Sequence, residues 1–203
     1  MVDVTELVLV RHGETVWHAE NRYAGVSDVG LTERGAAQAE RLGRWAAAHP
    51  VDAVAASTLS RARLTAQPAA EALGLPLSTD ERLCEVDFGA GEGLTRTEMA
   101  ERFPEALAAF LAAPARNPLP SGEPGTAAID RARPALDALV AEHPDGRVLV
   151  VMHSTLLRLV LCDLLGIDPD RYRTVMPSVA NGALTTVRTD GTSYALLGFN
   201  VPA

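Results

Sequence analysis

Disulfide frameworks and membrane anchors have little support in this sequence. Its 203 residues include two cysteines, Cys84 and Cys162, which form no C-x-x-C pair. Residues 1–6 lack the basic and apolar stretches of a secretory signal peptide. The most apolar helical candidate, residues 156–167, contains two charged side chains and is too short to span a bilayer. These absences predict a cytoplasmic protein with reduced thiols.

Positive charge is also in deficit. The 18 lysines and arginines are outnumbered by 26 aspartates and glutamates, which gives a formal net charge of −8 at pH 7. An acidic surface repels nucleic acid and anionic membranes, so neither is expected as a partner. The sequence has no His-Glu-x-x-His, no Cys/His cluster and no carboxylate-rich loop, so we expect no metal and no other cofactor. A small anionic substrate remains compatible with this charge where arginines converge locally.

What the chain does contain is a set of short apolar runs that end at polar residues. Residues 7–10, 51–56 and 148–152 are apolar throughout or nearly so. Such runs are typical of strands buried on both faces in a parallel sheet that helices cover. In open α/β sheets, ligands bind outside the carboxyl ends of the strands. The polar residues that follow these runs are therefore expected to line a site.

Helical segments separate the strand candidates. Four are predicted, over residues 31–48, 59–73, 126–142 and 155–165. Thr32 is the expected N-cap of the first, and Gly74 and Gly166 are expected to end the second and the fourth. A final hairpin is predicted between residues 184–188 and 193–199. The whole chain is predicted to be a single α/β domain, a three-layer α/β/α sandwich with a mostly parallel central sheet.

Residues 103–125 interrupt this alternation. They contain five prolines around one alanine-rich helical piece, and prolines at this density exclude one long helix and favour an irregular excursion over the surface. The segment is either a lid over the site or a plain connector. We favour the lid, because long loops in compact domains are often functional, and we expect it to influence the choice of substrate.

Four short motifs occur in order along most of the chain. They are RHGET at 11–15 with LTERG at 31–35, STLSRA at 57–62, LCE at 83–85 with FG at 88–89, and VVMHS at 150–154 with LR at 157–158. Together they resemble the motifs of the histidine phosphatase superfamily, in its phosphoglycerate-mutase-like branch. The resemblance implies that branch's α/β/α fold and a phosphatase acting on a small phosphorylated metabolite.

The resemblance also implies a role for each of five residues. His12 would be the nucleophile, Arg11, Arg61 and His153 would line the phosphate pocket, and Glu85 would be the acid and base. A phosphate monoester is a dianion, and the donor forks of arginine match its oxygens. Nearby arginines also lower the pKa of a histidine, which keeps it neutral for attack. Attack would form a phosphohistidine, which splits hydrolysis into two easier steps.

Each of these residues also has a structural interpretation. Arg11 would be a surface cation at a strand end, and His153 a buried histidine with satisfied hydrogen bonds. Arg61 lies near a helix start, where the dipole disfavours a cation and so indicates an anionic partner. Only the motif position distinguishes Glu85 from three neighbouring carboxylates, Glu81, Asp87 and Glu92.

Several positions depart from the pattern of the family. His18 stands where an asparagine usually helps to hold phosphate, and Ala24 replaces a common polar residue. We expect His18 to donate a similar hydrogen bond, or to add charge at low pH. Ser154 follows His153 where glycine is usual, and its place at a helix N-terminus suits an anion. His18 and Ser154 are therefore expected to bind substrate beside Arg11, Arg61 and His153.

The sequence thus predicts a metal-independent phosphatase that forms a phosphohistidine on His12. One alternative is a cofactor-dependent phosphoglycerate mutase, which returns the phosphoryl group to bound substrate. We favour hydrolysis because residues 200–203 leave little chain after the last strand to exclude water. The second alternative is a non-catalytic member that binds phosphorylated ligands, although a binder needs neither a nucleophile nor an acid. Symmetry statistics alone favour a homodimer.

Overall fold

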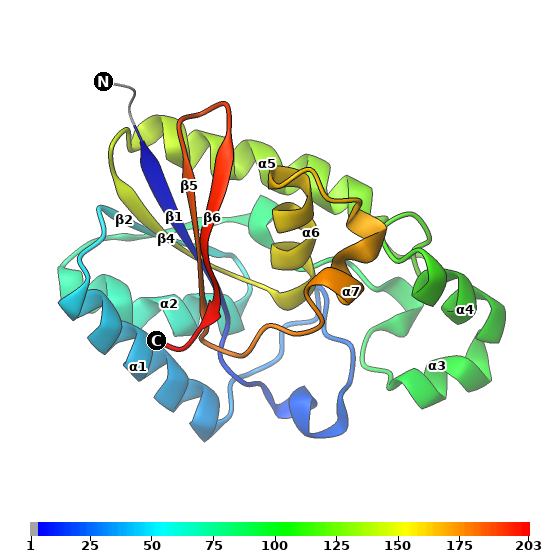
Figure 1. The fold of residues 1–203 in the computed structure, drawn as a ribbon. Helices are drawn as coiled ribbons and strands as arrows, with labels where there is room; N and C mark the ends of the chain where they lie inside the picture. The colour runs from blue at the N-terminus through cyan, green and yellow to red at the C-terminus, as the bar shows by residue number, and fades with distance from the viewer. Residues whose placement is uncertain (1–3) are drawn as a thin grey trace.

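A single mixed sheet organises the protein, in a computed structural model that describes residues 4–203 (Figure 1). Its strands are β1 Thr5–Arg11, β2 Ala53–Ser57, β3 Leu77–Asp80, β4 Arg147–Met152, β5 Leu184–Thr189 and β6 Tyr194–Val201. Their order across the sheet is β3-β2-β4-β1-β5-β6. The first four strands run parallel, whereas β5 is antiparallel to β1 and β6 to β5. The predicted mostly parallel sheet is confirmed.

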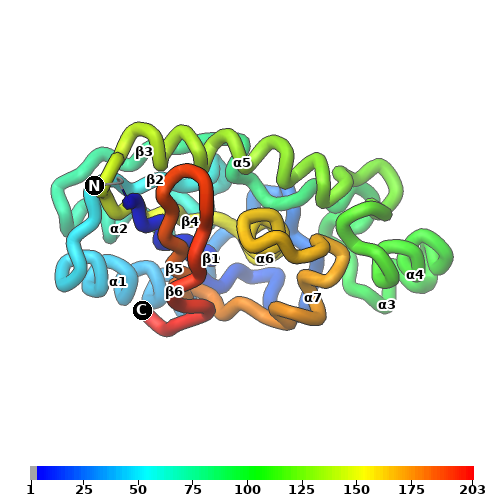
Figure 2. The backbone as a smooth tube through the Cα atoms, turned by 45° about the horizontal axis from the view of Figure 1, so that its top comes forward, coloured from blue at the N-terminus to red at the C-terminus, as the bar shows by residue number. Residues whose placement is uncertain are grey.

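Helices cover both faces of the sheet, which confirms the predicted three layers. They are α1 Glu33–Ala48, α2 Ser60–Leu73, α3 Arg96–Arg102, α4 Pro104–Ala112, α5 Gly125–Glu142, α6 Ser154–Leu164 and α7 Tyr172–Val175. Figure 2 shows α1 and α5 on opposite sides of the strands. Helices α3 and α4 lie beside each other, away from the sheet (Figure 1). Among residues 4–203, no helix combines the length and apolarity needed to cross a bilayer.

The continuously apolar strands follow from this layering, because alternate residues of β1 enter different cores. Leu7 and Leu9 belong to the cluster that includes residues of α5 and α6. Val8 and Val10 belong to the opposite cluster, with residues of α1 and α2. All four are at most 1% exposed. The middle of a strand that is packed on both faces is therefore apolar, and polar side chains are found toward its ends.

The local signals of the helices hold in the structure. Thr32 caps α1 by accepting a hydrogen bond from the backbone nitrogen of Gly35 at 3.0 Å. Gly74 and Gly166 both have a φ of 66°, the left-handed conformation that glycine adopts without strain. The predicted hairpin is present as β5 and β6.

Three elements carried no usable sequence signal. Strand β3 has a single apolar residue, Leu77, and forms the edge of the sheet beside β2. Helix α3 spans seven residues and depends on a capping box between Thr95 and Glu98. Helix α7 spans four residues. Short segments like these are stabilised by their tertiary neighbours more than by their own periodicity.

Candidate active site

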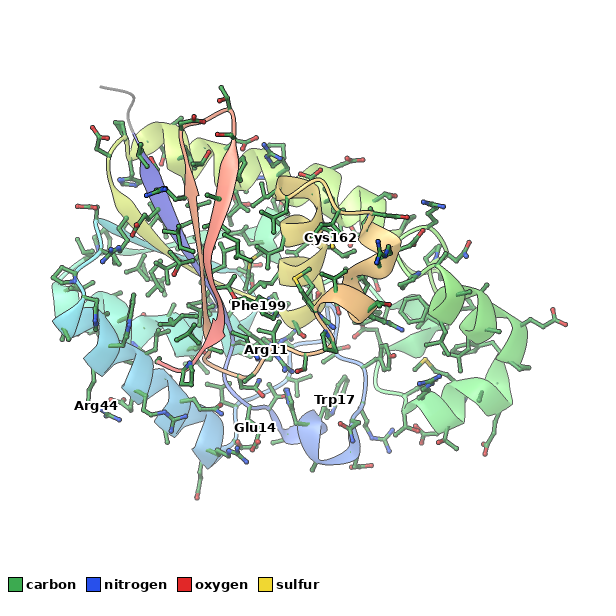
Figure 3. All side chains as sticks on the ribbon, in the orientation of Figure 1. Arg11, Glu14, Trp17, Arg44, Cys162 and Phe199 are labelled. Carbon is green, nitrogen blue, oxygen red and sulfur yellow. The ribbon has the colours of Figure 1, made fainter. Side chains whose placement is uncertain are left out.

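The candidate residues meet at the carboxyl ends of the parallel strands. Arg11 is the last residue of β1, and its side chain lies where that strand leaves the sheet (Figure 3). His12 follows it, and His153 follows β4 as the N-cap of α6. The centroids of the two imidazole rings are 5.1 Å apart. The separate motifs of the sequence are therefore neighbours in space, as the strand-end argument predicts.

His12 is held in one tautomer by the turn that follows it. Its Nδ1 lies 2.7 Å from the carbonyl oxygen of Gly13. A carbonyl only accepts, so Nδ1 carries the ring proton and Nε2 keeps a free lone pair. Gly13 permits the turn, because a Cβ at this position would lie 2.6 Å from the carbonyl oxygen of Gly35. The side chain of His12 is 5% exposed.

The surroundings of His12 keep it neutral. Burial lowers its pKa well below the ordinary value, and the positive charges of Arg61 and Arg11 lower it further. A neutral imidazole with a free Nε2 is the form of histidine that can act as a nucleophile.

Arg11 is fixed by two acceptors, and one of its nitrogens makes no hydrogen bond within residues 4–203. Its Nη1 donates to the carbonyl oxygen of Val179 at 2.6 Å. Its Nη2 contacts Nε2 of His18, also at 2.6 Å. Its buried Nε has no hydrogen-bond partner among the described residues. Burial, the largest cause, lowers the pKa of this arginine to about 10, which leaves the guanidinium charged at neutral pH.

Arg61 is fully buried in the first turn of α2. Its Nη1 donates to the carbonyl oxygen of Ser27 at 2.7 Å, and its Nη2 donates to that of Gly25. These carbonyls hold the guanidinium but do not neutralise its charge. Its Nε has no partner within residues 4–203. Burial lowers its pKa, whereas the charge of Glu85 raises it.

His153 is fully buried behind His12. Its Nε2 lies 2.6 Å from Oγ of Ser57, the last residue of β2. Its Nδ1 is buried and without a partner in the described part of the chain. Burial lowers the pKa of His153 well below the ordinary value, and the charge of Arg61 adds to this effect.

Buried polar atoms without partners gather at this site. In residues 4–203 there are four such side-chain atoms, namely Arg11 Nε, Arg61 Nε, His153 Nδ1 and Asp170 Oδ2. The last lies 3.0 Å from Nε of Arg116 in an ion pair. The other three belong to residues that the sequence assigns to the phosphate pocket. Because unsatisfied buried polar groups are rare in folded proteins, this coincidence indicates a ligand site.

Glu85 is held by backbone amides at the start of α6. Its Oε2 accepts from the nitrogen of Thr155, and its Oε1 from that of Leu156, both at 2.8 Å. The nitrogen of Val86 donates to the same Oε1 at 3.0 Å. The positive end of the helix dipole supports a carboxylate at this position. Of the four candidate carboxylates, Glu85 alone lines the cavity that contains His12.

The cavity has a volume of about 430 Å³. It is lined by Arg11, His12, Thr15, His18, Asn21, Arg22, Tyr23, Ala24, Glu85, Phe88, Ser154, Thr155, Arg158, Tyr172, Arg173 and Pro177. Ser154 is among these residues, whereas Arg61 and His153 are not, and binding of substrate by Ser154 stays a prediction. The segment 103–125 contributes none of these lining residues, although the ring of Phe110 packs against Tyr23. That the segment acts as a lid remains a prediction.

His18 contacts Arg11 in a way that differs from the expected donor role. Arg11 Nη2 can only donate, so Nε2 of His18 is the acceptor between them. Its Nδ1 faces Thr15, whose backbone nitrogen donates to it at 3.0 Å and whose Oγ1 lies 2.8 Å away. Burial and the charge of Arg11 lower the pKa of His18. In this structure His18 orients the arginine, and its binding of substrate remains a prediction.

Substitution of His18 by asparagine is expected to weaken the loss of activity in acid. In acid, below the ordinary range of a histidine pKa, wild-type His18 carries a proton on both ring nitrogens, so Nε2 no longer accepts from Arg11 and the hydrogen bond between them breaks. Asparagine can accept from Arg11 but gains no charge. Between pH 7.5 and pH 5, the fold decrease in kcat/KM should be about three times smaller for the variant than for the wild type. Parallel pH profiles would rule out a titrating His18.

The two deeply buried histidines are expected to make folding sensitive to acid. His12 and His153 have folded pKa values below 6.5, so the unfolded chain binds protons more readily than the folded chain. Stability is therefore complete above pH about 6.5 and declines below it, by about 1.4 kcal/mol per histidine and pH unit. Urea unfolding at pH 7.5 and 5.5 should show a difference of about 2 to 3 kcal/mol. His12→Ala should remove about half of that difference, and an equal slope in the variant would contradict the assignment.

Three supporting residues carried no signal in the sequence. Asn181 Nδ2 donates to the carbonyl oxygen of His12 at 2.9 Å. Thr65 Oγ1 accepts from the backbone nitrogen of Gly13, also at 2.9 Å. Arg131 donates to the carbonyl oxygen of Glu85 at 3.0 Å. Thr65 lies three residues after the second motif, and no pattern in the chain distinguishes Asn181 or Arg131 from ordinary surface residues.

Known proteins share this arrangement of sequence and fold. The chain matches the histidine phosphatase superfamily (branch 1) over residues 7–202. It is 32% identical over 169 residues to phosphoserine phosphatase 1 of Hydrogenobacter thermophilus, with 83% of this chain and 80% of the relative covered. It is 33% identical over 168 residues to the probable phosphoglycerate mutase GpmB of Erwinia tasmaniensis, with 83% and 78% covered.

The similarity extends to a solved structure. YhfR of Bacillus stearothermophilus superposes with a TM-score of 0.91 at 31% identity, and 98% of each chain is covered. The family match includes every motif from which the site was predicted. The protein therefore belongs to branch 1 of the histidine phosphatase superfamily and is a phosphatase of phosphoric monoesters.

Proposed function

We propose that the protein hydrolyses a small phosphorylated metabolite through a phosphohistidine on Nε2 of His12. The observation that carries this proposal is the set of three unused buried nitrogens, from Arg11, Arg61 and His153, beside a neutral His12. A phosphoryl group would supply oxygens to all three. If Oγ of Ser57 donates to Nε2 of His153, the ring proton lies on Nδ1, which then donates as the two arginines do.

The proposed reaction has two steps. First, His12 Nε2 attacks phosphorus, the bond from phosphorus to the ester oxygen breaks, and Glu85 donates a proton to the leaving alkoxide. Next, water attacks the phosphohistidine, Glu85 accepts a proton from that water, and the bond between phosphorus and nitrogen breaks. Arg11 and Arg61 stabilise the charge that develops on the phosphoryl oxygens in both steps.

We propose that neither step requires a metal. Among residues 4–203, no three His, Cys, Asp or Glu side chains are grouped so that they could hold a metal ion. Two arginines occupy the place where charge must be neutralised. The substrates named for the relatives, phosphoserine and phosphoglycerate, are both small phosphorylated acids, and this is the substrate class that we propose for the chain.

A mutase reaction is the second candidate, because one relative is a probable phosphoglycerate mutase. It would use the same phosphohistidine and return the phosphoryl group to a bound phosphoglycerate instead of to water. Phosphate release and transfer between phosphoglycerates should be measured on the same preparation. We expect release to be the faster reaction, and much faster transfer would favour the mutase.

The phosphohistidine is tested by labelling. Enzyme mixed with a ³²P-phosphomonoester in the presence of EDTA and quenched in alkali should carry label on the peptide that contains His12. The label should be lost in acid, as expected of a phosphoramidate. Label on a hydroxyl side chain would contradict the nucleophile, and loss of turnover with EDTA would contradict metal independence.

A further inference from the structure

Within residues 4–203, two helical arginines that line the cavity have no carboxylate partner. Arg158 lies on α6 and Arg173 on α7, and both are half-buried. Within residues 4–203, neither forms an ion pair with a carboxylate. Arg22, which lines the same cavity, is paired with Glu20 and Glu98. Arg158 and Arg173 therefore leave uncompensated positive charge facing the cavity.

The two side chains are held in place by aromatic rings. The guanidinium of Arg173 lies 4.5 Å from the ring centre of Phe110, and its Nε donates to the hydroxyl of Tyr172 at 2.8 Å. The guanidinium of Arg158 lies 4.7 Å from the ring centre of Tyr172. Stacking of this kind fixes the plane of a guanidinium while its edge stays free to donate.

Donors on both arginines remain unused. Arg158 donates through Nε to the carbonyl oxygen of Ser154 at 2.9 Å and through Nη1 to that of Met176 at 3.2 Å. Its Nη2, like both Nη atoms of Arg173, has no hydrogen bond among the described residues. The positive charges also affect each other, because Arg173 contributes to the lowered pKa of Arg158, after burial as the largest cause. Two like charges in a partly buried wall are stabilised by an anion between them.

The single carboxylate of the cavity wall does not serve as that anion. Glu85 already accepts three backbone hydrogen bonds. The reacting phosphoryl group has its own donors at the strand ends, on Arg11, Arg61 and His153. Arg158 lies about one helical turn along α6 from Ser154, and Arg173 lies on α7, so neither belongs to the strand ends. These two arginines therefore suit a second anionic group.

We propose that Arg158 and Arg173 form a subsite for a second anionic group of the substrate, a carboxylate or a second phosphate on the same carbon skeleton. The inference rests on the proposed phosphatase function and assigns two residues to the recognition of the second acidic group of its substrates. A planar carboxylate matches the paired donors of an arginine. Phosphomonoesters with one neutral end would leave these charges unpaired and should be poorer substrates.

A matched pair of esters tests the subsite. 3-Phosphoglycerate carries a carboxylate at the position where glycerol 3-phosphate carries a hydroxymethyl group. The wild type should show a kcat/KM about 10- to 100-fold higher for 3-phosphoglycerate, as expected for hydrogen bonds to a charged group. A comparison of kcat/KM for fructose 1,6-bisphosphate and fructose 6-phosphate tests a second phosphate in the same way. A ratio near one for both pairs would overturn the proposal.

Variants of Arg173 test whether this residue causes the preference for the acidic ester. Arg173→Gln should reduce the ratio at least fivefold, mainly through KM of the acidic ester, and Arg173→Lys should restore part of it. Arg171→Gln is the matched control, because Arg171 is an exposed arginine two residues away that does not line the cavity. It should leave the ratio unchanged. Equal effects of Arg171→Gln and Arg173→Gln would show a general charge effect and overturn the subsite.

Binding separates this inference from the proposed function. In His12→Ala, which should not turn over, calorimetry should give a Kd for 3-phosphoglycerate about tenfold or more below that for glycerol 3-phosphate. If the wild type released no phosphate while this preference persisted, the phosphatase mechanism would be contradicted and the subsite supported. If phosphate were released without any preference in rate or binding, the subsite alone would be wrong.

Discussion

Replacement of His12 by alanine is expected to lower the rate of phosphate release by about four orders of magnitude or more, as loss of a nucleophile does in other covalent catalysts. The reason lies in the geometry of the ring. Nδ1 is committed to the carbonyl oxygen of Gly13, so Nε2 is the free nitrogen beside Arg11 and Arg61. Water in the same place lacks both the nucleophilicity and the orientation of that nitrogen.

Binding should survive in this variant. The phosphate donors on Arg11, Arg61 and His153 belong to other side chains, so Kd for inorganic phosphate should change by less than about tenfold. His49→Ala is the control, because His49 is an exposed histidine that stacks on Trp45, away from the cavity. Stopped-flow or coupled phosphate assays can measure the rates. Retention of a tenth or more of wild-type activity in His12→Ala would eliminate the proposed nucleophile.

The placement of the site could be predicted because it depends on where strands end. Strands β1 and β4 are buried on both faces, so their first polar residues mark the edge of the sheet. Parallel pairing puts Arg11 opposite Met152, the residue before His153. Sequence patterning thus places His12 and His153 at the same edge of the sheet, whereas the pairing of β1 with β4 is known from the structure.

Residues whose importance comes from a tertiary partner could not be predicted in this way. Asn181 precedes β5 in a loop, and its amide acts only because that loop passes beside His12. Arg131 is one of several arginines on helices, and it acquires a role when α5 packs beside the loop of Glu85. The acceptor role of His18 likewise depends on the side-chain orientation of Arg11, which Val179 fixes from a distant segment.

Replacement of Glu85 by glutamine is the second change with a large expected effect, about 10²- to 10⁴-fold in kcat for an alkyl phosphate. Glutamine keeps the shape of the side chain but has no proton to donate to the leaving alkoxide. It also turns one carboxylate oxygen into an NH2 group that faces a backbone N–H of Thr155 or Leu156. The lost hydrogen bond should lower the free energy of unfolding by about 1 to 3 kcal/mol, which urea titration can measure separately.

The two proposed roles of Glu85 can be separated by the choice of leaving group. Nitrophenolate leaves without a proton, so Glu85→Gln should still phosphorylate His12 from p-nitrophenyl phosphate while water attack is slow. The variant should therefore give a burst of nitrophenolate close to one equivalent per enzyme and accumulate alkali-stable phosphoprotein. Glu81→Gln, at an exposed carboxylate outside the cavity, should show neither effect. The absence of a burst, with alkyl and aryl esters slowed alike, would show that Glu85 acts only in holding α6 and not in proton transfer.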